Sequence, residues 1–161
     1  MKELKSVFSR EELTENAVKL LKKLIATPSM SRDEYNVSLI IEGFFNEHQI
    51  KVNRFKNNIW AINKHFDAGK PSILLNTHHD TVKPNKAYTL DPFIPVEKDG
   101  KLFGLGSNDA GASLVAMAQT FLYFYEAEDL THNLVIALTA EEEISGLDGI
   151  EALFPQLPNV E

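Results

Sequence analysis

Two segments near the N-terminus carry hydrophobic side chains at the spacing of an α-helix. Each follows a Ser-x-x-Glu pattern, at residues 9–12 and 31–34, which is typical of a capping box at the start of a helix. We expect the first helix to end near Thr27, because a residue that precedes proline avoids helical backbone angles. The second helix is predicted to run to about His48.

The hydrophobic pattern then changes to that of strands. Residues 51–56 and 58–64 predict two strands joined by a turn at Asn57-Asn58. Continuous apolar runs at residues 72–77 and 133–139 are typical of strands that are buried on both faces, as in a parallel or mixed sheet.

A strongly apolar segment from Asp109 to about Glu126 predicts a helix between these two buried strands. Strands that alternate with helices indicate an α/β fold, and we predict a three-layer αβα sandwich with a mixed, mostly parallel sheet. In such folds ligands bind beyond the carboxyl ends of the strands. The polar clusters that follow residues 72–77 and 133–139 are therefore expected at the same edge of the sheet.

Composition and charge exclude several classes of function. The 161 residues suit one domain, and the absence of cysteine excludes thiolate zinc ligands and cysteine nucleophiles. The net charge of −7 and the scattered lysines argue against a nucleic-acid partner. No apolar run is long enough to span a bilayer, and the charged segment MKELKSVFSREEL lacks the apolar centre of a signal peptide. We therefore predict a cytoplasmic protein without a membrane partner.

His78-His79-Asp80 directly follows the first buried strand. An imidazole that binds a metal usually donates its second N–H to a carboxylate, and residues two apart in an extended chain face the same way. His78 and Asp80 have the spacing for such a pair. The alternative is a solvated polar loop that is rich in histidine.

A second cluster, GLGSNDAG at residues 104–111, is rich in glycine and contains Asp109. A phosphate-binding GxGxxG loop would need glycine at this position, and a carboxylate would repel phosphate. Taken alone, the pattern favours Asp109 as the N-cap of the helix that follows.

A third cluster places Glu141, Glu142 and Glu143 after the second buried strand. These residues could form the acidic first turn of a helix. Alternatively, a divalent cation relieves their repulsion, or one carboxyl has a raised pKa and acts as a base. One histidine and several carboxylates suit zinc or another borderline divalent ion, and an aspartate commonly bridges the ions of two-metal hydrolases.

The three clusters together resemble the M20 family of zinc-dependent metallopeptidases and amidohydrolases. HHDTV at residues 78–82 resembles the H-x-D-x-V element of the family, GLGSNDAG resembles G-R-G-x-x-D-x-K-G, and TAEEE at residues 139–143 resembles T-x-D-E-E. The chain departs from the family at Leu105, which replaces an arginine, and at Glu141, which replaces an aspartate. It also lacks the lysine of D-x-K-G and is one residue shorter there. The resemblance implies a fold like that of zinc exopeptidases.

The resemblance implies three metal ligands for two Zn²⁺ ions, which are His78, Asp109 and Glu143. Asp109 would bridge both ions, and Co²⁺ or Mn²⁺ are alternative metals. Asp80 would orient His78, and Glu142 would be the general base that takes a proton from water and returns it to the leaving amine. His79 stands at a variable position of the family and is assigned neither role.

The implied reaction is hydrolysis of the amide bond of a small N-acyl amino acid or a dipeptide. The variant GLGSNDAGAS is most similar to acetylornithine deacetylase-like members, so the expected reaction is deacetylation of N-acetylornithine in arginine biosynthesis. Succinyl-diaminopimelate desuccinylase, aminoacylase and dipeptidase activities are alternatives within the family. An inactive fragment, a non-catalytic binding module or a domain completed by another polypeptide are alternatives of other kinds.

Family members are considerably longer than this chain. We expect residues 1–161 to be the N-terminal portion of a truncated metallohydrolase catalytic domain. The lid or dimerisation domain and the C-terminal catalytic segment, with two further metal ligands, would lie outside it. The chain alone is expected to bind metal weakly and to be inactive, and the full-length protein to be a homodimer.

Overall fold

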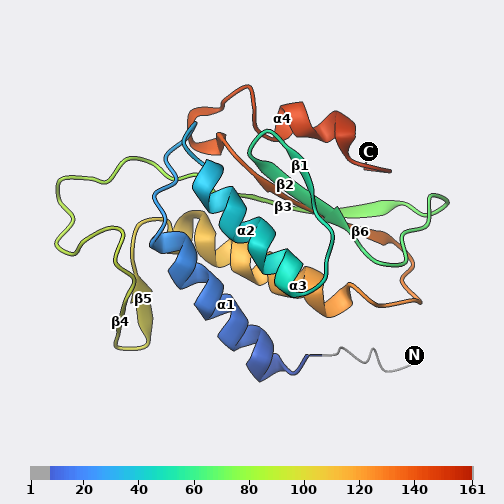
Figure 1. Cartoon of the computed structure of the whole chain (residues 1–161), viewed down its shortest axis with the longest axis horizontal. Helices are drawn as coiled ribbons and strands as arrows, with labels where there is room; N and C mark the ends of the chain where they lie inside the picture. The colour runs from blue at the N-terminus through green and yellow to red at the C-terminus, as the bar shows by residue number, and fades with distance from the viewer. Residues whose placement is uncertain (1–7, 161) are drawn as a thin grey trace.

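The computed structural model describes residues 8–160 (Figure 1). The α-helices are α1 (Arg10–Ile25), α2 (Tyr35–Glu47), α3 (Ser113–Phe124) and α4 (Ile150–Leu153). The strands are β1 (Asn53–Phe55), β2 (Asn58–Ile62), β3 (Ser72–His78), β4 (Val96–Lys98), β5 (Lys101–Phe103) and β6 (Asn133–Thr139). Short helical turns are η1 (Ser107–Ala112), η2 (Glu142–Ile144) and η3 (Phe154–Gln156).

The main sheet has the strand order β1-β2-β6-β3, and β4 pairs with β5 in a separate hairpin. Only β3 and β6 are parallel, whereas β1 pairs with β2 and β2 pairs with β6 in antiparallel fashion. The mixed sheet is confirmed, but the expectation of mostly parallel strands is wrong. The reason is the β1–β2 hairpin, since strands joined by a tight turn pair in antiparallel fashion. This turn uses Lys56, which has a φ of 55°, and Asn58 already begins β2.

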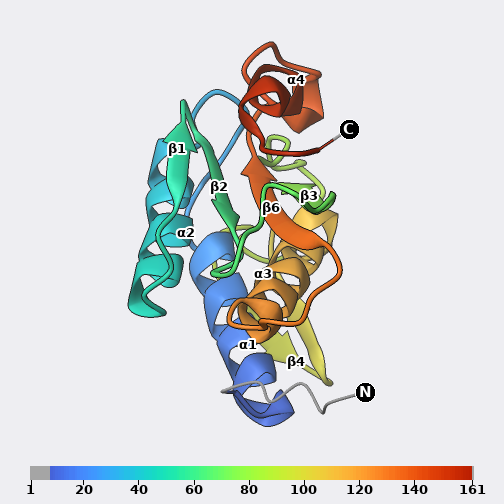
Figure 2. The ribbon, with the colours of Figure 1, turned by 90° about the vertical axis from the view of Figure 1, so that its right-hand side faces the viewer.

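Helices cover both faces of the sheet, as expected for an α/β fold. Ile136 of β6 packs in a cluster with side chains of α1, α2 and α3. Its neighbours Val135 and Ala137 pack against Leu153 of α4 and against Leu157. In both views α4 lies apart from the other three helices (Figure 1, Figure 2).

Burial of the two apolar strands differs. All seven residues of β6 are buried, because strands flank both of its edges and side chains from other elements pack on both of its faces. By contrast, β3 lies at the edge of the sheet, and Ile73 is 47% exposed. The expectation that residues 72–77 are buried on both faces is therefore wrong among the described residues.

The two predicted capping boxes have different outcomes. Ser9 and Glu12 form the reciprocal hydrogen bonds of a capping box at the start of α1, as predicted. The second box is wrong, because α2 begins after Glu34 and has no side-chain cap. Ser31 and Glu34 instead contact residues distant in the sequence.

The helices formed by residues 8–160 include none that is long and apolar enough to cross a membrane. The sequence predicts no signal peptide in the segment MKELKSVFSREEL. Residues 1–7 of this segment lie outside the described residues.

Candidate metal centre

The candidate site is assembled at the ends of the parallel strands β3 and β6. Their register pairs His78 with Thr139, so the residues that follow each strand emerge side by side. The backbone N–H of His79 also donates to the carbonyl of Thr139 over 2.9 Å. This pairing brings two of the polar clusters together, although they are about sixty residues apart in the sequence.

The ring of His78 is oriented by Asp80. His78 Nδ1 lies 3.0 Å from the backbone carbonyl oxygen of Asp80 and 3.4 Å from its Oδ1. Both oxygens accept, so Nδ1 carries a proton that it donates to them. The other nitrogen, Nε2, lies 3.2 Å from Asp109 Oδ1 and 3.6 Å from Glu142 Oε2. If His78 were neutral, the lone pair of Nε2 would face two carboxylates and be repelled by them. A proton or a metal cation bound at Nε2 would remove this repulsion.

The electrostatics of His78 agree with this geometry. The hydrogen bond to Asp80 and the charges of Asp80 and Glu142 outweigh burial and raise the pKa of His78 to about 9. The position beside Nε2 therefore favours a positive charge.

Asp80 is fully buried, and its carboxylate accepts three hydrogen bonds from two other segments of the chain. Its carboxylate accepts from Ser31 Oγ at 2.7 Å and from the backbone N–H groups of Glu142 and Glu143 at 3.1 Å each. Burial alone would raise the pKa of Asp80, but these bonds and the one from His78 lower it to about 2. Asp80 thus remains an anion that joins the histidine to the glutamate segment.

Asp109 lies in η1, not at the N-cap of α3, which begins four residues later at Ser113. The expectation that it caps this helix is wrong, because Ala112 occupies the N-cap position and no side chain caps the helix there. Tight packing of glycines shapes η1, because a Cβ on Gly111 would lie 2.4 Å from the carbonyl oxygen of Gly106. Gly106 itself has a φ of 72°, a conformation that glycine adopts without strain. The Asp109 side chain is 78% exposed and faces His78.

The three consecutive glutamates separate into two environments. Glu141 is nearly buried, has a φ of 57°, and accepts from the N–H of Asp148. Glu142 and Glu143 form the short turn η2, which is not the α-helical first turn considered above. Burial, together with the nearby charge of Asp109, raises the pKa of Glu143.

The structure brings the three sequence-predicted ligands into one cluster. One ligand atom each from His78, Asp109 and Glu143 lies within 4.8 Å of the others. An imidazole nitrogen and two carboxylate oxygens form a donor set that suits zinc. A cation would also stabilise the ionised form of Glu143, whose pKa is raised by burial and by the charge of Asp109. The residues present therefore fit a divalent metal ion.

His79 is buried away from this cluster. It lines a cavity of about 20 Å³ together with apolar side chains that include Leu24 and Leu114. Burial lowers the pKa of His79 to about 4, so the ring is neutral at pH 7.

Comparisons with known proteins agree with this site. The model for peptidase family M20/M25/M40 matches residues 74–160, a span that contains all three clusters. A succinyl-diaminopimelate desuccinylase from Sulfurovum sp. is 28% identical over 91% of this chain and 39% of its own length. An acetylornithine deacetylase from Proteus mirabilis is 37% identical over 80% of this chain and 36% of its own length.

The fold is also found in solved structures. A dinuclear metal-binding peptidase of the M20 family from Bacillus subtilis superimposes with a TM-score of 0.70. The two sequences are 18% identical, and the match covers 95% of this chain and 42% of the other. The chain thus spans about two fifths or less of the length of these relatives.

Proposed function

The chain belongs to peptidase family M20/M25/M40, and from this membership we propose that it contributes the metal-binding edge of an amide hydrolase. The observation that carries the proposal is the cluster of His78, Asp109 and Glu143, whose ligand atoms lie within 4.8 Å of one another. Metal-binding activity of an M20 relative with the same fold supports it.

In this proposal His78 and Asp109 would hold one Zn²⁺ ion, and Asp109 and Glu143 would hold a second. Bound zinc would polarise the substrate carbonyl and lower the pKa of the attacking water. Asp80 fixes the tautomer of His78 so that Nε2 faces the cluster. Glu142 is the proposed general base, because its carboxylate reaches the cluster at Nε2 of His78 and its side chain is 60% exposed to an incoming substrate.

We propose a small N-acyl amino acid as the substrate. Similarity to an acetylornithine deacetylase favours N-acetylornithine, and similarity to a desuccinylase makes N-succinyl-diaminopimelate the second candidate. Both substrates present an amide carbonyl beside a charged amino-acid group, so the same cluster of carboxylates and histidine would serve either one.

We also propose that residues 1–161 act as the N-terminal portion of a longer catalytic domain. The ligand count supports this: with Asp109 shared, the cluster supplies two protein ligands for each ion, whereas catalytic zinc normally has three. The chain alone should therefore bind metal weakly and hydrolyse little substrate. A lid domain, a homodimer and a cytoplasmic location stay predictions.

A calorimetric zinc titration of the chain tests the proposed site. We expect Asp109→Ala to weaken binding at least about tenfold, since it removes the ligand shared by both ions. Glu128→Ala is the matched control, because Glu128 is an exposed carboxylate beyond the far end of β6. Equal zinc affinity of wild type and Asp109→Ala would refute the metal centre. N-acetylornithine hydrolysis by the longer protein, measured alongside N-succinyl-diaminopimelate, then tests the substrate.

A further inference from the structure

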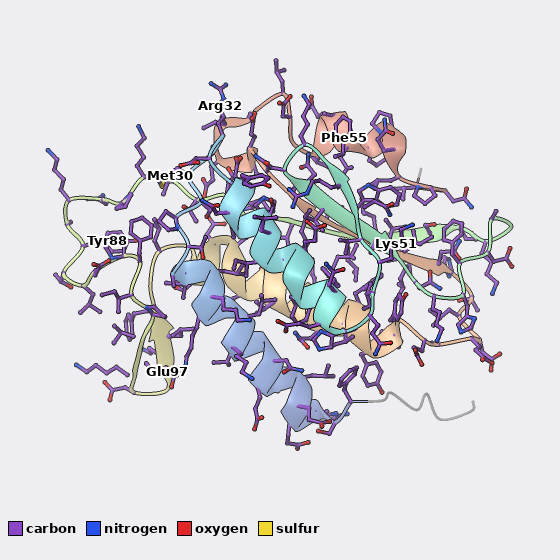
Figure 3. All side chains as sticks on the ribbon, viewed as in Figure 1. Met30, Arg32, Lys51, Phe55, Tyr88 and Glu97 are labelled. Atoms are coloured by element: carbon purple, nitrogen blue, oxygen red, sulfur yellow. The ribbon has the colours of Figure 1, made fainter. Side chains whose placement is uncertain are left out.

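The loop between α1 and α2 contacts the proposed site through two side chains that the sequence pattern assigns to a helix cap. We propose that Ser31 and Glu34 are positioning residues, which hold the Asp80 carboxylate and the Glu141–Glu143 segment in the geometry that metal binding needs. This inference rests on the proposed function. Met30 and Arg32 mark the loop in Figure 3, where it lies beside the chain that follows β6.

Ser31 acts on the carboxylate that orients His78. Its hydroxyl donates to Asp80 Oδ2 over 2.7 Å, and this same oxygen accepts from the N–H of Glu143. The backbone holds the loop in place, since the N–H of Thr81 donates to the carbonyl of Ser29 over 2.9 Å. Ser31 thereby fixes the side of Asp80 that faces away from His78.

Glu34 acts on the start of the glutamate segment. Its side chain is fully buried, and no salt bridge to it is found among residues 8–160. Oε1 accepts from the N–H groups of Arg32 at 2.6 Å and Glu141 at 3.3 Å, and Oε2 accepts from Asn57 Nδ2 at 2.9 Å. A buried carboxylate is costly unless hydrogen bonds stabilise it, so Glu34 ties these three segments firmly together.

The two contacts form one support for the segment that carries the proposed base and ligand. The N–H groups of Glu141, Glu142 and Glu143 are three in a row, and each donates to a buried carboxylate, either Glu34 or Asp80. Glu141 has left-handed backbone angles, which a residue with a Cβ adopts at some cost, and the bond from its N–H helps to hold them. Loss of either support would let η2 move relative to His78.

Amide hydrogen exchange of the metal-free chain, followed by NMR, measures this support directly. We expect Ser31→Ala and Glu34→Ala to speed exchange at Glu141–Glu143 about tenfold, as charge-assisted hydrogen bonds are lost or loosened. Ser31→Thr keeps the hydroxyl and should restore slow exchange. Glu34→Gln should restore slow exchange in part. The amide oxygen of the glutamine can accept from the N–H groups of Arg32 and Glu141, and Asn57 can rotate its side-chain amide so that its oxygen accepts from the glutamine NH2 group.

Asn133→Ala is the matched control. Asn133 is a buried polar residue at the opposite end of β6, where its side chain makes three hydrogen bonds to Asp67 and Lys70. This variant should destabilise the chain and speed exchange near residues 67–70, without a local effect at Glu141–Glu143. The same local acceleration in Asn133→Ala, or unchanged exchange in both Ser31→Ala and Glu34→Ala, would overturn the inference.

Co²⁺ titration links the support to the site. We expect Ser31→Ala and Glu34→Ala to weaken Co²⁺ binding about tenfold and to alter the visible absorption of the bound ion, whereas Asn133→Ala leaves both unchanged. Unaltered Co²⁺ affinity and spectrum in the first two variants would overturn the positioning role. Failure of the wild-type chain to bind Co²⁺ would count against the proposed metal function, and the exchange rates would then decide the positioning by themselves.

Discussion

The hydrogen bond between His78 and Asp80 predicts how the stability of the metal-free chain depends on pH. The pKa of His78 is about 9 in the folded chain and 6.5 for an unperturbed histidine. At about 1.4 kcal/mol for each pKa unit, this difference corresponds to ~3 kcal/mol of unfolding free energy. Because the folded pKa is raised, the contribution is fully present below pH 6.5 and is lost as the pH rises through about 9.

The size of this effect is set by a buried pair. His78 is 8% exposed and Asp80 is fully buried, so solvent screens their interaction little. The hydrogen bond with His78 also helps to lower the pKa of Asp80, and this shared part is one contribution and not a sum. No thiol titrates between pH 6.5 and 9, because the chain has no cysteine.

Urea denaturation in the presence of a chelator, at several pH values from 6 to 9.5, measures the effect. Wild type should lose ~3 kcal/mol across this range. Asp80→Asn removes the negative charge, so it should be less stable at pH 6 and show a much smaller loss toward pH 9.5. A wild-type unfolding free energy that stays constant over this range, or an equal slope in Asp80→Asn, would refute the reasoning.

Three further predictions follow from other residues. Burial lowers the pKa of His79 to about 4. The stability of the folded chain that depends on a neutral His79 is therefore fully present above pH 6.5, and ~3 kcal/mol of unfolding free energy should be lost as the pH falls to 4. In urea denaturation, His79→Leu should remove this part of the loss. Glu142→Gln in the longer hydrolase should lower kcat by about 10²–10⁴-fold while calorimetry still detects zinc, as expected for a general base. Gly111→Ala should cost at least ~2 kcal/mol in thermal unfolding and weaken zinc binding, because its Cβ would meet the carbonyl of Gly106. Gly43→Ala is its control, since that Cβ meets nothing within 4 Å and should stabilise α2 slightly.

The sequence predicts those parts of the fold in which local pattern and tertiary environment agree. The apolar run of β6 has strands on both sides, and its burial matches the expectation. The shorter apolar run of β3 lies at the sheet edge among the described residues, and no local pattern reveals which neighbours a strand has. The antiparallel pairing of β2 with β6 is likewise a long-range contact.

Sequence motifs predict the candidate ligands, and the rule for parallel strands predicts that the clusters after residues 72–77 and 133–139 share one edge of the sheet. The local pattern does not predict where Asp109 lies relative to them. His78, Asp109 and Glu143 meet because β3 and β6 are parallel and because η1 turns Asp109 toward them. The spacing before α3 equally suits an N-cap, and the two interpretations are distinguished by the start of the helix at Ser113, four residues after Asp109. Their roles in catalysis stay predictions until metal binding is measured.

Ser31 and Glu34 show why the same pattern has different outcomes at two places in one chain. A capping box contributes about 1 kcal/mol, and at Ser9 the side chain makes this local bond with the N–H of Glu12. At Ser31 the competing acceptor is the buried carboxylate of Asp80, and a hydrogen bond to a charged group contributes about 1.5–3 kcal/mol. Leaving that carboxylate without the bond would add a desolvation penalty, so the long-range contact prevails and α2 begins without a side-chain cap. A Ser-x-x-Glu pattern beside a buried acidic site therefore indicates a candidate support for that site as well as a helix start.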